Sequence, residues 1–89
     1  MESKRDIIIE NKLGLHARPA AQLVQVASKF DSEITFRRGE DEVNGKSIMG
    51  VLMLAAPLGS TIQVNARGED AAAAVQAVED LVAGKFGEE

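Results

Sequence analysis

Apolar residues recur along the chain with a helical period in three segments. Between Ala17 and Phe30 they lie three and four positions apart, which is typical of one face of an amphipathic helix; they are Ala20, Leu23, Val24, Ala27 and Phe30. A similar stripe runs from Asp70 to Ala83 and ends before Gly84, a residue that often stops helices. Lys46 to Leu54 is a shorter apolar segment that opens as a helix at Ser47. The pattern therefore predicts three helices.

Alternation of apolar and polar residues predicts the strands. Ser32 to Arg38 and Ser60 to Gly68 alternate with a period of two, and Asp6 to Glu10 is a short β-branched run. A very short strand is expected around Val43, between two turns. The order strand, helix, strand, strand, helix, strand, helix predicts an α+β fold. We expect a two-layer open-faced sandwich, in which three helices cover one face of a four-stranded antiparallel sheet, as a single domain over residues 1–89.

Composition narrows the classes of function. The formal net charge of −4 and the absence of Trp and Tyr weigh against nucleic-acid binding, which favours a basic surface and aromatic stacking. With no cysteine and one histidine, we expect neither a metal site nor a bound cofactor. The apolar run from Ile48 to Gly59 is too short to span a bilayer, and the amino terminus lacks the apolar core of a signal peptide. These features predict a cytoplasmic protein with no membrane partner.

The histidine, His16, stands where a loop meets the first helix, and Pro19 falls in the first turn. Free N–H groups and the helix dipole favour an anion at that place. Imidazole can attack phosphorus, and a phosphoryl group on its ring would lie near the guanidinium of Arg18. A helix cap or a packed side chain is the alternative interpretation of His16. The chain has no second histidine, no cysteine and no clustered carboxylates, so a carrier of a group fits better than an enzyme.

Two motifs resemble those of a known family. The segment GLHARPAAQLV, from Gly14 to Val24, resembles the active-site signature of HPr, the histidine-containing phosphocarrier of the bacterial phosphoenolpyruvate-dependent phosphotransferase system. KSIMGVLML, from Lys46 to Leu54, resembles the second signature of that family. The resemblance implies that His16 accepts phosphate at Nδ1 from enzyme I and passes it to enzyme IIA domains, that Arg18 contacts the phosphoryl group, and that the sheet order is 1-4-2-3.

The same resemblance leaves the biological branch open. NKLGLHARPA, LMLAAPLG and the ending GKFGEE are similar to the nitrogen-related members of the family, whereas other features match the sugar-uptake members. In relatives with KSIMG, the serine that corresponds to Ser47 is phosphorylated by a kinase/phosphorylase. From the residues alone, Ser47 is first a helix N-cap. We therefore expect Ser47 to be a helix N-cap and, from the resemblance, a site of regulatory phosphorylation.

The short helix has more apolar residues than one sheet can bury. If Val51 and Leu54 face the core, then Ile48, Met49 and Leu52 remain near solvent beside His16. We predict that these three residues, with Leu15 and Ala21, form the surface that binds partner proteins.

The sequence is compatible with three classes of function to different degrees. The leading hypothesis is a monomeric phosphocarrier that is loaded on His16. The alternative is a regulatory protein that binds partners through the same surface without carrying phosphate, which the intact HARPA segment disfavours. A ligand-binding or metal-chaperone domain is the third, and the chain lacks the cysteines and the glycine-rich anion loop that it would need.

Overall fold

The computed structural model describes residues 1–87. The elements follow the predicted order, with one short 3-10 helix added at the end. Their bounds are β1 Glu2–Ile8, α1 Ala17–Ser28, β2 Glu33–Arg38, β3 Asp41–Asn44, α2 Ile48–Met53, β4 Thr61–Arg67, α3 Ala71–Ala83 and η1 Lys85–Gly87. The prediction of one domain extends over residues 88 and 89, which lie outside the described residues.

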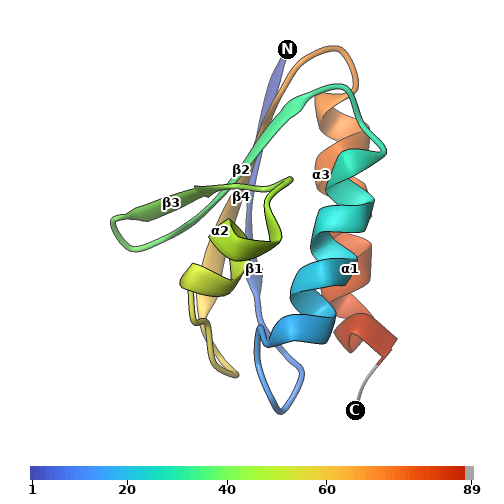
Figure 1. Cartoon of the computed structure of the whole chain (residues 1–89). Helices are drawn as coiled ribbons and strands as arrows, with labels where there is room; N and C mark the ends of the chain where they lie inside the picture. The colour runs from blue at the N-terminus through green and yellow to red at the C-terminus, as the bar shows by residue number, and fades with distance from the viewer. Residues whose placement is uncertain (88–89) are drawn as a thin grey trace.

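The four strands form one antiparallel sheet in the order β1-β4-β2-β3, which confirms the predicted topology. Within it, Phe36 of β2 lies opposite Val64 of β4 on one side and Val43 of β3 on the other. Three helices pack against the sheet, with α1 and α3 running antiparallel to each other (Figure 1). Consequently the start of α1 and the end of α3 lie at the same end of the molecule.

The core lies between the helices and the inner face of the sheet. Alternate residues of β2 and β4 are buried, as a strand with one covered face requires: Ile34, Phe36, Ile62, Val64 and Ala66. The helices bury the stripes that the sequence predicted, which include Ala20, Leu23, Ala27, Ala74, Val75, Val78 and Val82. The other face of the sheet is mostly polar, with Ile8 as an exposed apolar residue, so the sandwich has one hydrophobic layer.

The first strand begins earlier than its β-branched run suggests. β1 starts at Glu2 because antiparallel pairing continues to Arg67 of β4, through residues whose polar character shows no alternation. Ile9 lies past the end of β1, yet its N–H donates to Ser60 O at 2.9 Å and its carbonyl accepts from Gly59 N at 2.8 Å. The predicted strand, Asp6 to Glu10, therefore covers only the second half of β1.

The last turn of the chain was not predicted. α3 ends at Gly84 as expected, but Lys85 and Phe86 follow with φ angles of 56° and 58° in the left-handed region. Phe86 is buried, so its packing in the core compensates for this backbone conformation. α1 ends at Ser28, whereas the sequence pattern extended this helix to Phe30. Phe30 lies in the loop after α1 and packs against the core.

Candidate functional site

The loop between β1 and α1 presents His16, and a tight turn shapes it. Gly14 N donates to Asn11 O at 3.1 Å, and the Asn11 side chain returns a hydrogen bond from Nδ2 to Gly14 O at 2.7 Å. Gly14 has a φ of 71°, which glycine adopts without strain. Asn11 is fully buried at this turn.

This loop rests against the loop that connects α2 to β4. Leu15 N donates to Ala56 O at 2.8 Å, and a Cβ on Gly14 would lie only 2.6 Å from the same carbonyl oxygen. Both loops lie at the lower end of the molecule in Figure 1. The approach is so close that only glycine fits at position 14, and the loop that carries His16 is held in one place.

His16 is the N-cap residue of α1. Its backbone is extended, with φ −88° and ψ −169°, and its side chain forms no capping hydrogen bond with the helix that follows. Its N–H donates to Gly14 O at 3.0 Å, and its carbonyl accepts from Ala20 N at 3.0 Å. The residue is half-buried. The ring is therefore carried at the tip of the helix instead of being part of the core.

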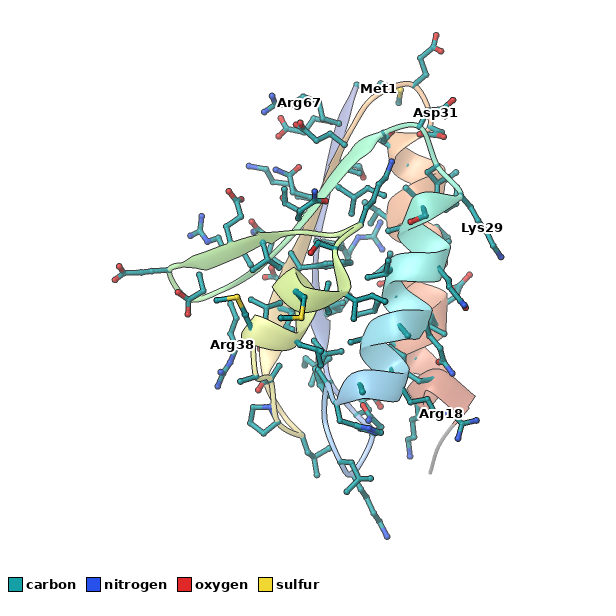
Figure 2. The ribbon with its side chains drawn as sticks, viewed as in Figure 1. Met1, Arg18, Lys29, Asp31, Arg38 and Arg67 are labelled. Carbon is teal, nitrogen blue, oxygen red and sulfur yellow. The ribbon has the colours of Figure 1, made fainter. Side chains whose placement is uncertain are left out.

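The first turn of α1 supplies the electrostatic setting of His16. Pro19 has no N–H, and by helix geometry the N–H groups of Ala17 and Arg18 have no acceptor within the helix. They mark the positive end of the helix dipole. Arg18 is exposed and lies at the lower end of α1 (Figure 2). His16 and Arg18 are thus two positions apart at the same helix end, which is the arrangement expected for holding an anion.

Ser47 caps α2. Its Oγ accepts a hydrogen bond from Gly50 N at 3.1 Å, so the N-cap interpretation is confirmed. Beside it, Lys46 Nζ donates to Phe30 O at 2.7 Å, which ties the start of α2 to the segment after α1. α1 and α2 lie next to each other (Figure 1).

The exposure of the α2 side chains can be compared with the expected one, whereas partner binding there stays a prediction. Val51 and Leu54 are buried, whereas 45% of Ile48 and 72% of Met49 are exposed. Leu52 and Ala21 are half-buried. We define the α2 surface as the apolar residues at this place that reach solvent: Ala21, Ile48, Met49, Leu52 and Met53.

Two residues change this surface relative to the sequence prediction. Leu15 is only 5% exposed and belongs to the core cluster, so its side chain is not part of the α2 surface. Met53 was not included, although it is 75% exposed. Its spacing of four positions from Met49, one helical turn, is the sequence signal that places it on the same side of α2.

Within residues 1–87, no group of three or more His, Cys, Asp or Glu side chains could hold a metal ion. No helix in this part of the chain is long and apolar enough to cross a bilayer.

Comparison with known proteins gives consistent matches over nearly the whole chain. The family model described as PTS HPr component phosphorylation site matches residues 3–84. Phosphocarrier protein HPr of Neisseria meningitidis is 49% identical over 85 residues, 96% of either chain. Phosphocarrier protein NPr of Shewanella violacea is 47% identical, over 96% of this chain and 93% of that protein. The crystal structure of HPr-C-His from Thermoanaerobacter tengcongensis superposes with a TM-score of 0.94 at 47% identity, covering 98% of both chains.

Proposed function

Because the chain belongs to the HPr family of phosphocarrier proteins, we propose that it carries its phosphoryl group on His16. The observation that supports this assignment is the place of His16, as the N-cap residue of α1 with its side chain outside the cap hydrogen bonds. A phosphate there lies near the N–H groups of Ala17 and Arg18 and the positive end of the helix.

The proposed chemistry needs few groups. The lone pair of Nδ1 attacks phosphorus, an N–P bond forms, and the bond between phosphorus and its donor breaks. The choice of Nδ1 rests on the family resemblance. Phosphoryl transfer depends mainly on positioning and on charge stabilisation, which the helix tip and the exposed Arg18 guanidinium would supply. The group is later passed on, so the protein returns to its starting state.

We propose that enzyme I is the donor and that enzyme IIA domains are the acceptors, and that the protein works as a cytoplasmic monomer. Docking takes place on the α2 surface, where exposed apolar side chains lie on the helix beside α1. Methionine side chains such as Met49 and Met53 adapt to different partners because they are unbranched and flexible. Relatives of both the HPr and the NPr type match at similar identity, so the proposal covers either branch.

Ser47 is proposed as a regulatory phosphorylation site. Its Oγ is at the start of α2, next in sequence to the exposed Ile48 and Met49. A phosphate at that oxygen would place about two negative charges beside an apolar docking surface. Partners that bind by burying this surface would then pay a desolvation cost, and transfer from enzyme I would slow.

The test of the carrier function is incubation with phosphoenolpyruvate, Mg²⁺ and purified enzyme I, followed by mass spectrometry. We expect one added phosphoryl group that is labile in acid and stable in base. His16→Ala should take up none and should keep the circular dichroism spectrum of the wild type, because the half-buried ring is outside the core cluster. A wild-type chain that remains unmodified while it binds enzyme I would favour the regulatory alternative.

A further inference from the structure

The buried amide of Asn11 lies at the base of the His16 loop. Asn11 is fully buried, and its main-chain carbonyl and its side chain together bind both backbone groups of Gly14. The main-chain carbonyl of Asn11 accepts from Gly14 N at 3.1 Å, while Nδ2 donates to Gly14 O at 2.7 Å. Because a buried N–H group is stable only when it is hydrogen-bonded, the bond to Gly14 O holds the Nδ2 end of this side chain in place.

The carbonyl that Asn11 binds is also the acceptor for His16. His16 N donates to Gly14 O at 3.0 Å, so the Asn11 amide and the His16 backbone share one oxygen atom. The buried side chain of Asn11 is thus linked to the backbone of His16 through one acceptor atom.

The peptide group between Gly14 and Leu15 is held at both edges. Its oxygen, Gly14 O, receives the Asn11 side chain, and its N–H, on Leu15, donates to Ala56 O at 2.8 Å. Because a peptide group is planar, two such bonds on opposite edges determine its tilt. His16 follows directly, and its backbone direction depends on that tilt. Of these two hydrogen bonds, only the one from the Asn11 side chain can be removed by substitution, because Ala56 binds through its backbone carbonyl.

We propose that Asn11 is a positioning residue for phosphoryl transfer: its amide sets the tilt of the Gly14–Leu15 peptide and thereby the place of the His16 ring. The inference rests on the proposed function of His16. Asn11 does not touch the phosphoryl group, and it lies outside the α2 surface that binds partners. Its loss should therefore reduce the rate of the chemical step and leave docking nearly unchanged.

The test uses Asn11→Leu, which keeps the branched shape of the side chain and removes its donor. Initial rates of phosphoryl transfer from phosphorylated enzyme I are measured against the concentration of the full chain. We expect kcat to fall about tenfold while KM stays within about twofold, since small misplacement of a reacting group lowers rate more than binding. The amide signals of Leu15 and His16 in ¹H–¹⁵N spectra should also shift.

Two further variants keep the result interpretable. Asn11→Ala is smaller and also lacks the amide donor, so it replaces Asn11→Leu if that variant does not fold. Ser32→Ala is the matched control, because it removes a buried side-chain hydrogen bond at the opposite end of the molecule. It should lower stability without changing kcat.

The proposal would be overturned by a folded Asn11 variant that has the kcat of the wild type, or by one whose decrease in kcat is no larger than that of Ser32→Ala. Failure of the proposed function itself gives a different result, in which the wild type takes up no phosphate on His16.

Discussion

At the scale of single residues, one observed role and one proposed role fall on the same oxygen atom of Ser47. Its Oγ accepts from Gly50 N, and the same atom is the proposed site of phosphorylation. A phosphate ester still presents oxygen acceptors at the helix start, where negative charge is favourable. Modification therefore need not unfold α2, and its effect should appear in partner binding instead of in stability.

Two substitutions separate these roles. Ser47→Ala removes the cap and should lower the free energy of unfolding by about 1 kcal/mol, while transfer from enzyme I stays close to wild type. Ser47→Asp keeps an N-cap acceptor and adds a negative charge, so it should preserve stability and slow transfer. Urea denaturation and transfer kinetics measure the two effects. Unchanged kinetics in Ser47→Asp would remove the regulatory role of Ser47.

At the scale of elements, α2 is unusual because it is apolar around most of its circumference. Of its six residues, Ile48–Met53, only Val51 is fully buried, and both methionines are more than 70% exposed, at 72% and 75%. Exposed apolar side chains that cluster on one short helix contribute little to the fold. Their concentration on a helix that contacts both α1 and β3 agrees with the proposed docking of partners there.

Met49→Gln tests the docking role of α2. Loss of one exposed apolar anchor should raise the KM for this protein in transfer from enzyme I by roughly fivefold, equivalent to about 1 kcal/mol of binding. The stability of the chain should be nearly unchanged. The control is Ile8→Gln, because Ile8 is 55% exposed but lies on β1, on the opposite side of the sheet from the helices. Equal effects of the two substitutions would contradict a specific α2 surface.

At the scale of the whole molecule, different kinds of hydrogen bond stabilise the two ends. At the end that carries His16, backbone hydrogen bonds join two loops. At the opposite end, where Asp31 lies in Figure 2, a carboxylate joins two turns. Asp70 accepts from Asp31 N at 2.9 Å, from Ser32 N at 3.0 Å, and from the Ser32 hydroxyl. The pKa of Asp70 is lower than its ordinary value. The hydrogen bond from the Ser32 hydroxyl is the largest cause, and the hydrogen bond from the Asp31 amide is the second. One side chain thus joins the turn before β2 to the turn before α3.

This carboxylate predicts how stability depends on pH. Because its pKa is lower in the folded chain, its contribution is complete above the unfolded value of about 3.9 and is lost as pH falls through the folded value. Asp70→Asn should therefore be less stable than wild type at neutral pH, and the two should converge in acid. Urea denaturation at several pH values measures this, with Asp41→Asn as the control for loss of one charge. A constant difference at all pH values would contradict the role of Asp70.

Local patterns in the sequence were sufficient to predict the elements and the centre of the site. The helical stripe around Leu23, the alternation around Val64, the cap at Ser47 and the stop at Gly84 are all properties of neighbouring residues, and all are present in the structure. The place of His16 at a helix start follows for the same reason. Its role as phosphate carrier is a proposal from the family resemblance, because spacing alone does not distinguish a carrier from a cap.

What the sequence could not determine depends on segments that meet only in the folded chain. β1 begins at Glu2 because β4 pairs with it. Leu15 and Phe86 are buried because they join a core cluster that other elements form. A periodic pattern shows which side of an element is apolar, whereas the neighbour that covers it is decided by tertiary packing.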